Sequence, residues 1–217
     1  MTVLPNSSEK LEMWVRKRLF FNLFNIAALI INITEVLLSL MIKTGKFKEH
    51  PIKFIVGLGN PGNEYQDTFH NVGMMFIGSV QKDAKWLKGD GVRYFKKSGL
   101  VFCQPDVFMN DSGIAFLKAT RCFGLKIKET LVVHDDTDLA IGSYKFSFGR
   151  GAAGHKGVLS VMKVFKTPEF WRLRVGIRSD ADKKKKAGDI VLKKINAKSS
   201  EAILTTFKKA LDELGLL

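Results

Sequence analysis

The chain has 217 residues, of which 46% are hydrophobic, so it is long and apolar enough to bury one core and carry an appendage. Its formal net charge of +14 and its pI near 9.8 favour a polyanionic partner, either nucleic acid or an anionic membrane. The alternative is a surface that is merely rich in lysine. The two cysteines, Cys103 and Cys122, lack metal-ligand spacing and exclude a disulfide framework, and we expect both to be buried, reduced thiols.

The first fifty residues differ from the rest of the chain. The basic stretch Arg16 to Arg18 precedes an apolar run at residues 19–42 that is long enough to span a bilayer. This run contains polar side chains that are costly in lipid, namely Asn22, Asn25, Asn32 and Glu35. No small-residue cleavage site follows it, which argues against a cleaved signal peptide. Two interpretations stay open: residues 19–42 form a membrane anchor, or translation starts at Met41 and residues 1–40 lie outside the natural product.

The excess of positive charge belongs mainly to the part of the chain after residue 50. Residues 1–50 hold 7 basic and 4 acidic residues, which leaves 28 basic and 17 acidic residues, a surplus of +11, in residues 51–217. We therefore predict a hydrophobic N-terminal extension over residues 1–50 and one basic domain over residues 51–217.

After Pro51, short apolar runs alternate with longer mixed segments. Strands are predicted at residues 53–58, 99–104, 130–136, 144–148 and 172–177. Helices are predicted at residues 71–87, 112–124, 157–165 and 199–215. This alternation predicts a single α/β domain in which helices flank a mixed central sheet. The segment "DADKKKKAGD" (Asp180 to Asp189) is predicted as a charged loop, whose lysines meet either phosphates or only water.

The stretch "GLGNPG" (Gly57 to Gly62) has the spelling of a dinucleotide-binding loop. Such a loop needs a helix that begins within it, but the polar stretch "NEYQDTF" follows, and Pro61 removes an amide donor. We therefore favour the alternative, in which the glycines turn the backbone sharply at the end of a strand and present Asn60.

The stretch "HDDTD" (His134 to Asp138) ends a predicted strand, which is where active-site carboxylates of open α/β sheets gather. Three interpretations compete. The carboxylates hold a metal ion, although no second acidic cluster completes the shell. One of them orients a histidine as a general base. Or the side chains only cap the turn. His70, in "TFHN" between a polar loop and a predicted helix, is expected on the same side of the sheet as Asn60.

Two further motifs are weak when each is taken alone. In "VFMNDSG", Asn110 lies just before a predicted helix and is explained equally well as a helix cap. The glycine-rich "GRGAAGHKG" (Gly149 to Gly157) suits close approach to a phosphate or a substrate backbone, or is an ordinary connection.

The combination and order of these motifs is far more specific than any one of them. "FIVGLGNPGNEYQDTFHNVG", "FMNDSG", "VVHDDTDLAIG", "GHKG" and "RLRVGI" together closely resemble the bacterial-type peptidyl-tRNA hydrolases, from Ile52 to about Lys194. The resemblance implies a monomeric cytoplasmic enzyme that hydrolyses the ester between a peptide and the 3′ ribose of tRNA. It implies neither a metal nor a cofactor. It also implies a surface that binds the acceptor stem and 3′ end of tRNA.

The resemblance also implies roles for individual residues. His70 matches the catalytic base, and Asp135 matches the carboxylate that holds the base in its active tautomer. The substrate-binding positions match as follows: Asn60 favours blocked aminoacyl ends, Asn110 holds the substrate near the scissile carbonyl, Tyr65 and Phe108 line the site, and Arg174 grips a tRNA phosphate.

Three departures from the family pattern stand out. Lys156 replaces a substrate-binding asparagine in "GHKG", and we expect its positive charge to slow turnover and to leave tRNA binding intact. Ser147 stands where a lysine usually completes the phosphate grip, with Lys145 or Arg150 as its substitutes. The chain also stops at Leu217, before the family's usual C-terminal helix. These departures keep open an alternative function, in which the same fold serves as a catalytically weakened tRNA- or RNA-binding scaffold.

Overall fold

A computed structural model describes residues 45–81 and 84–217, together with Arg16, Arg18, Leu19 and Ile26. The chain divides into two compact units, Met1–Leu40 and Met41–Leu217, and the second contains the fold described below. Among the described residues, no helix is both long enough and apolar enough to cross a membrane. The predicted anchor at residues 19–42 lies almost entirely outside the described residues.

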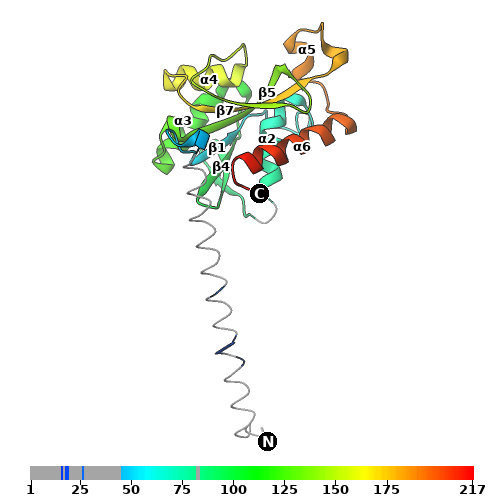
Figure 1. The fold of residues 1–217 in the computed structure, drawn as a ribbon. Coiled ribbons are helices and arrows are strands. Elements are labelled where there is room, and N and C mark those ends of the chain that lie inside the picture. Colours follow the sequence, from blue (N-terminus) through cyan, green and yellow to red (C-terminus); the bar gives the residue numbers. More distant parts are fainter. Residues whose placement is uncertain (1–15, 17, 20–25, 27–44, 82–83) are drawn as a thin grey trace, which may run out of the picture. The chain divides into compact units, whose positions relative to one another are not determined.

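The described part of the second unit is built around a seven-stranded mixed sheet with the order β2-β3-β4-β1-β5-β7-β6 (Figure 1). The strands are β1 Phe54–Gly57, β2 Leu87–Gly89, β3 Val92–Lys97, β4 Leu100–Pro105, β5 Thr130–Ala140, β6 Tyr144–Phe148 and β7 Trp171–Arg178. The central strands β4, β1, β5 and β7 are parallel, whereas the outer pairs β2–β3, β3–β4 and β7–β6 are antiparallel. The predicted fold class is therefore confirmed.

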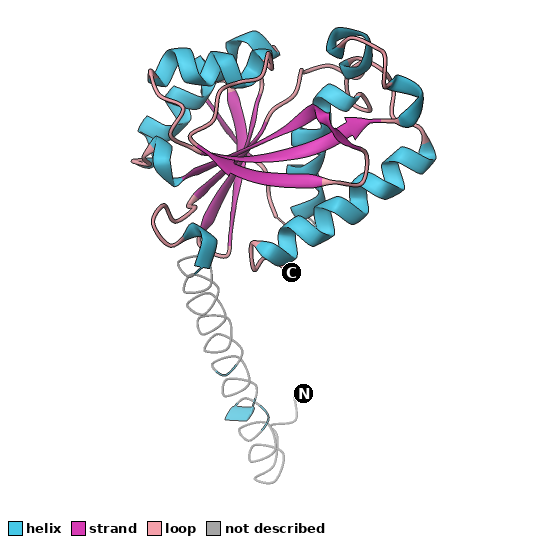
Figure 2. Ribbon diagram, turned by 45° about the horizontal axis from the view of Figure 1, so that its top comes forward, coloured by secondary structure: helices cyan, strands magenta, loops and turns pink. Residues whose placement is uncertain are grey.

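Helices cover both faces of this sheet, α3 and α4 on one and α2 and α6 on the other (Figures 1 and 2). The helices are α2 Val72–Val80, α3 Ser112–Phe123, α4 Lys156–Phe165, α5 Ala187–Val191 and α6 Ala197–Glu213. On one face, Phe54 of β1 packs with Phe116 of α3 in a fully buried cluster. On the other, Phe76 of α2 meets Phe207 of α6 edge to face, with ring centroids 5.3 Å apart. Because both faces are covered, β1 and β4 are buried at every position and carry apolar runs instead of an alternating pattern.

The predicted elements are all present, with differences at three places. The predicted helix at residues 71–87 ends at Val80 as α2. The hairpin of β2 and β3 was not predicted, because β2 is exposed throughout and has no apolar side to give a pattern. The charged segment after β7 is also not simply a loop, since it holds a 3-10 helix, Asp180–Asp182, and then α5.

The glycines of "GLGNPG" serve close packing more than turning. A Cβ atom on Gly57 would lie 2.1 Å from the carbonyl oxygen of Gly73, and one on Gly73 would lie 2.3 Å from the carbonyl oxygen of Val133. Helix α2 therefore approaches β1 and β5 more closely than any side chain allows. Of the three glycines in this stretch, only Gly62 has a positive φ, at 107°. Because no helix begins within residues 58–68, the geometry of a dinucleotide-binding loop is absent there.

Only one of the two cysteines is buried, so the expectation for the other was wrong. Cys103 lies within β4, and burial raises the pKa of its thiol far above the ordinary value. Cys122 is exposed near the end of α3, on the side of the helix that faces away from the sheet.

Candidate active site

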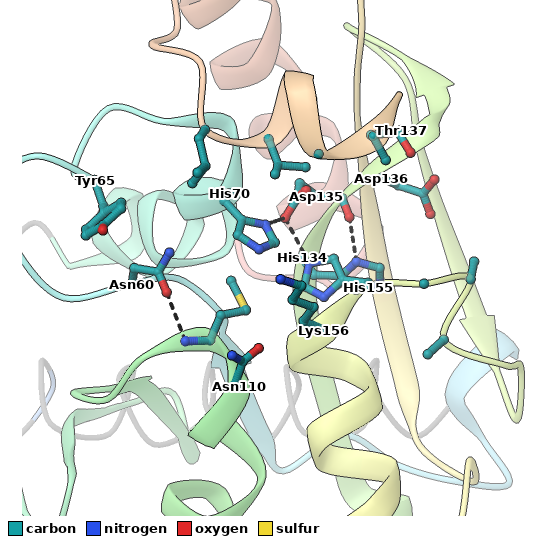
Figure 3. Close-up of a pocket in the computed structure, with 18 of the residues that line it drawn as sticks. Asn60, Tyr65, His70, Asn110, His134, Asp135, Asp136, Thr137, His155 and Lys156 are labelled. Atoms are coloured by element: carbon teal, nitrogen blue, oxygen red, sulfur yellow. Dashed lines mark hydrogen bonds and ion pairs between the residues drawn. The ribbon is translucent and has the colours of Figure 1, made fainter. Parts of the chain in front are cut away.

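A cavity of about 440 Å³ opens at the carboxyl ends of β1, β4 and β5. Seven of the eight predicted site residues line it: Asn60, Tyr65, His70, Phe108, Asn110, Asp135 and Lys156 (Figure 3). They come from four separate segments of the chain that the parallel strands bring to one edge of the sheet. Arg174 is the exception: it lies on β7 and does not line the cavity, but it contacts Asp136, which does.

His70 and Asp135 form the centre of this cavity. His70 lies in the short 3-10 helix Phe69–Asn71 that leads into α2, and its Nδ1 atom is 2.9 Å from Oδ1 of Asp135 on β5. Both side chains are buried. Since the carboxylate accepts the Nδ1 proton, the hydrogen bond assigns the tautomer in which Nε2 keeps its lone pair. Such an imidazole can take a proton from a water molecule in the cavity.

A second histidine holds the same carboxylate oxygen. Nε2 of His155 is 2.9 Å from Oδ1 of Asp135, while Nδ1 of His155 accepts the backbone N–H of Val158 at 3.3 Å. An imidazole nitrogen that accepts a backbone N–H carries no proton, so Nε2 of His155 is the donor to Asp135. His155 is also the N-cap residue of α4. One side chain thus connects the start of α4 to the carboxylate of Asp135.

These hydrogen bonds keep Asp135 ionised. Burial by itself would raise the pKa of its carboxyl group, but the attraction of His155 and the hydrogen bonds from His155 and His70 outweigh burial and hold the pKa well below its ordinary value. A charged Asp135 can stabilise the imidazolium that forms when His70 takes a proton.

Hydrogen bonds hold both the backbone and the side chain of Asn60 in place. Asn71, the neighbour of His70, accepts the backbone N–H of Asn60 at 2.8 Å and donates to its carbonyl oxygen at 2.9 Å. The side-chain oxygen of Asn60 accepts the backbone N–H of Met109 at 2.9 Å. The Nδ2 group is therefore left to point into the cavity, where it can donate to a substrate oxygen (Figure 3).

The wall opposite His70 is built from the segment after β4 and the start of α4. Tyr65 and Phe108 meet edge to face with ring centroids 6.3 Å apart. Asn110 lies in a 3-10 helix and does not cap α3, whose N-cap residue is Asp111. Gly157 lets α4 approach this wall, because a Cβ atom there would lie 2.3 Å from the sulfur of Met109.

Arg174 forms an ion pair with Asp136, the residue that follows Asp135. Its Nε atom donates to Oδ2 of Asp136 at 2.5 Å. Lys145 on β6 is the direct cross-strand partner of Arg174, so the two side chains share one face of the sheet. Ser147 is instead paired with the buried Arg172. Of the two candidates for the missing lysine, the strand register thus favours Lys145.

A family model described as peptidyl-tRNA hydrolase matches residues 54–217. The peptidyl-tRNA hydrolase of Persephonella marina is 35% identical over 178 residues, which cover 75% of this chain and 94% of that protein. The peptidyl-tRNA hydrolase of Hydrogenobaculum sp. is 36% identical over 165 residues, 73% of this chain and 87% of that protein. The chain belongs to the peptidyl-tRNA hydrolase family.

The solved structures agree with this membership. A crystal structure of peptidyl-tRNA hydrolase from Acinetobacter baumannii aligns with a TM-score of 0.68 at 29% identity, over 76% of this chain and 88% of that one. The resemblance that the ordered motifs carry is confirmed, and with it the assignment of the chain to a family of hydrolases.

The metal interpretation of "HDDTD" does not fit the geometry. Asp135 and Asp136 point to opposite faces of β5, the first toward the histidines and the second toward Arg174 (Figure 3). Among the described residues, one group, His70, Asp135 and His155, has ligand atoms within 4.8 Å of one another. Its ligand atoms hydrogen-bond to one another, and a cation would have to displace the protons that both imidazoles share with Asp135.

Two residues of this site were not among the predicted site residues. His155 and Asn71 each follow or precede a predicted site residue, in "GHKG" and "FHN", and that adjacency was the one available signal. His134, the third histidine, is buried, and burial keeps the pKa of its imidazole well below the ordinary value. Its Nδ1 atom is 2.6 Å from the backbone carbonyl oxygen of Asp135. It is therefore a neutral imidazole that hydrogen-bonds to the backbone of β5.

Proposed function

We propose that this chain hydrolyses the ester between a peptide and the 3′ ribose of tRNA, with His70 as general base and Asp135 as its orienting partner. One observation carries the proposal. The hydrogen bond from Nδ1 of His70 to a buried, ionised Asp135 leaves the other imidazole nitrogen in a cavity that also receives the amide of Asn60. A base and a fixed donor then face one space, which hydrolysis of an ester requires.

The reaction follows from these positions. Nε2 of His70 removes a proton from water as the oxygen attacks the ester carbonyl, and Asp135 stabilises the resulting imidazolium. The carbonyl oxygen takes up negative charge in the tetrahedral intermediate. When the intermediate collapses, the bond to the ribose oxygen breaks, and that oxygen receives the proton from His70. The products are a tRNA with a free 3′ end and a peptide with a free carboxyl group, which then loses its proton to water.

Two amides are suited to hold the peptide end. The Nδ2 group of Asn60 is preorganised by the hydrogen bond that Met109 donates to its oxygen, so it loses little freedom when it donates to the substrate. Asn110 borders the same cavity. Tyr65 and Phe108 offer aromatic surface for the terminal base and for the residue that carries the ester.

The tRNA is proposed to contact the sheet edge formed by β6 and β7. Lys145 and Arg174 are cross-strand neighbours there and form a pair of cations that can hold a backbone phosphate. The +11 surplus of residues 51–217 provides the wider attraction to the acceptor stem.

The remaining expectations about state and place are proposals as well. A monomer is proposed as the active form, as the resemblance to the family implies. Cytoplasmic location fits the substrate class, and membrane tethering through residues 19–42 is the alternative. Fractionation of the full chain against a variant that lacks residues 1–40 separates the two.

The decisive test is release of the acyl group from an N-acetylated aminoacyl-tRNA. Replacement of a general base costs about 10²- to 10⁴-fold, so we expect His70→Ala to lose activity on that scale. His50→Ala is the matched control, since His50 stacks on Phe148 outside the cavity. Retained tRNA binding without release by the wild-type chain would refute the proposal in favour of an RNA-binding scaffold.

A further inference from the structure

A buried arginine outside the catalytic cavity has no carboxylate to balance its charge. Arg172 on β7 is only 2% exposed, and it does not line the cavity. Within residues 45–81 and 84–217, no carboxylate lies within salt-bridge distance of its guanidinium group. Because a buried charge without a counter-charge is strongly unfavourable, Arg172 needs a partner that the described part of the chain does not supply.

The charges around Arg172 add to this need. Asp136 attracts Arg172, but its carboxylate is already bound by Arg174. Burial and the repulsion from Arg174 together lower the pKa of the Arg172 guanidinium from its ordinary value. Lys145, the cross-strand partner of Arg174, brings one more positive charge. Since β6 and β7 contain no acidic residue, this part of the sheet has an excess of positive charge.

Two buried polar atoms on neighbouring strands have no hydrogen-bond partner. Nη1 of Arg172 donates to the carbonyl oxygen of Gly151 at 2.9 Å, but Nε of Arg172 has no partner among the described residues. Ser147 on β6 is the direct cross-strand partner of Arg172, and its buried hydroxyl has no partner there either. Opposite residues on antiparallel strands have Cβ atoms about 5 Å apart. Nε only donates and the hydroxyl can donate, so a ligand that lies against both must accept hydrogen bonds.

A small anion meets both requirements of this place. It accepts hydrogen bonds from an N–H and an O–H group, and it also balances the guanidinium charge. Water satisfies the two donors but leaves the charge without compensation. The short distance between neighbouring strands favours a monatomic anion over a sulfate or phosphate group.

The loop that contacts Arg172 leads to the catalytic residues. Residues 149–154 join β6 to α4, and Gly151 in this loop accepts the hydrogen bond from Arg172. His155, the next residue, is the N-cap of α4 and donates to Asp135. An anion that holds the guanidinium group in place would therefore also stabilise the loop that positions His155.

We propose that Arg172 and Ser147 bind a monatomic inorganic anion, of the size and charge of chloride, beside the loop of residues 149–154. This site is separate from Lys145 and Arg174, which the proposed function assigns to a tRNA phosphate. The inference goes beyond the proposed function and does not depend on it, because the anion stabilises the fold whether or not the chain hydrolyses an ester.

The first test is thermal unfolding of the full chain in sodium chloride. Sodium gluconate, whose anion is too large for the site, keeps the ionic strength constant. Stabilisation by a bound ligand grows with the logarithm of its concentration, so the thermal midpoint of the wild type should rise by about 4 °C between about 10 mM and about 300 mM chloride.

Three variants separate an anion from a purely structural role of Arg172. Arg172→Met removes the buried charge, so its midpoint should not respond to chloride, and it should differ little from the wild type when chloride is low. Ser147→Ala keeps the charge and loses one donor, so it should need about tenfold more chloride for the same rise. Lys208→Met on α6 is the control, since it removes an exposed charge and should keep the full response.

The second test is a crystal of the full chain grown in sodium bromide. An anomalous-scattering peak should lie within hydrogen-bond distance of Nε of Arg172 and Oγ of Ser147. A map without a peak at this place would overturn the proposal. It also fails if the wild type and Arg172→Met respond equally to chloride, because the two donors are then satisfied by water. If Arg172→Met does not fold, Ser147→Ala and the bromide crystal decide.

Discussion

Nε2 of His155 lies 2.9 Å from Oδ1 of Asp135, the same oxygen that accepts from Nδ1 of His70. The carboxylate is thus held by two imidazoles, of which only one has a nitrogen left for chemistry. His155 uses its other nitrogen to accept the amide of Val158 at the start of α4. Its position makes it a positioning residue that acts through Asp135.

Loss of this second imidazole should slow the reaction without removing the base. A hydrogen bond to a charged group is worth about 1.5–3 kcal/mol, so we expect kcat of His155→Ala to fall about 10- to 100-fold. His155→Gln keeps an N–H that can reach Asp135 and should recover part of the loss. Single-turnover hydrolysis of an N-acetylated aminoacyl-tRNA measures both. Equal loss in the two variants, at equal thermal stability, would argue against a role through Asp135.

Asn60→Asp should show whether the Nδ2 group of this side chain donates to the substrate, because the variant removes that donor and keeps the contact with Met109. The aspartate keeps an oxygen for the amide of Met109, but it removes the Nδ2 donor and adds negative charge where the substrate carbonyl would lie. We expect kcat/KM to fall about 10²-fold. Asn63→Asp is the matched control, since Asn63 is an exposed residue of the same loop. An unchanged kcat/KM in Asn60→Asp would show that this amide does not meet the substrate.

Lys156→Asn should raise turnover. The ammonium group borders the cavity in which His70 must become positively charged, and repulsion between the two opposes that step. An asparagine is neutral and can also accept a hydrogen bond. We expect kcat on a one-residue substrate to rise several-fold, since two unit charges that water screens at close range repel each other by about 1 kcal/mol. Lys198→Asn is the control, because it removes a positive charge on α6, outside the cavity. No gain in hydrolysis would show that Lys156 does not limit the rate.

Residues 179–193 close one side of the cavity, and several of their side chains hydrogen-bond to Asp182. This carboxylate accepts from Lys193 at 2.5 Å, from Ser179 at 2.6 Å and from Lys185 at 2.9 Å. The hydrogen bonds from Lys193, Ser179 and Lys185 hold the pKa of the Asp182 carboxyl group well below its ordinary value. Arg178 donates to the carbonyl oxygens of the same segment, and the following helix α5 lines the cavity.

This arrangement predicts a pH-dependent stability. Because the folded pKa is depressed, Asp182 stabilises the fold above the unfolded pKa of about 3.9, and the contribution is lost as the pH falls further. Asp182→Asn should therefore lower the thermal midpoint at pH 7, and its difference from the wild type should shrink below pH 4. Asp180→Asn, at an exposed carboxylate of the same segment, is the control. A difference that stays constant from pH 7 to pH 3 would contradict the assignment.

The sequence by itself determined the elements that carry a local signal and the residues that form local motifs. Buried parallel strands such as β1 have continuous apolar runs, and helices such as α3 have a periodic apolar face, so both could be predicted. The gathering of His70, Asp135 and Asn60 at one site could be predicted as well, because each lies in a motif whose order along the chain is specific. The exposed strand β2 gave no signal, since packing makes no demand on its side chains.

Only the tertiary structure decided which side chains meet. His155 reaches Asp135 across 20 residues, Asn60 reaches Met109 across 49, and His70 reaches Asp135 across 65. Lys145 opposes Arg174 because of the register between β6 and β7. A hydrogen bond depends on separations of a few tenths of an ångström, which the packing of helices on the sheet sets and local sequence does not.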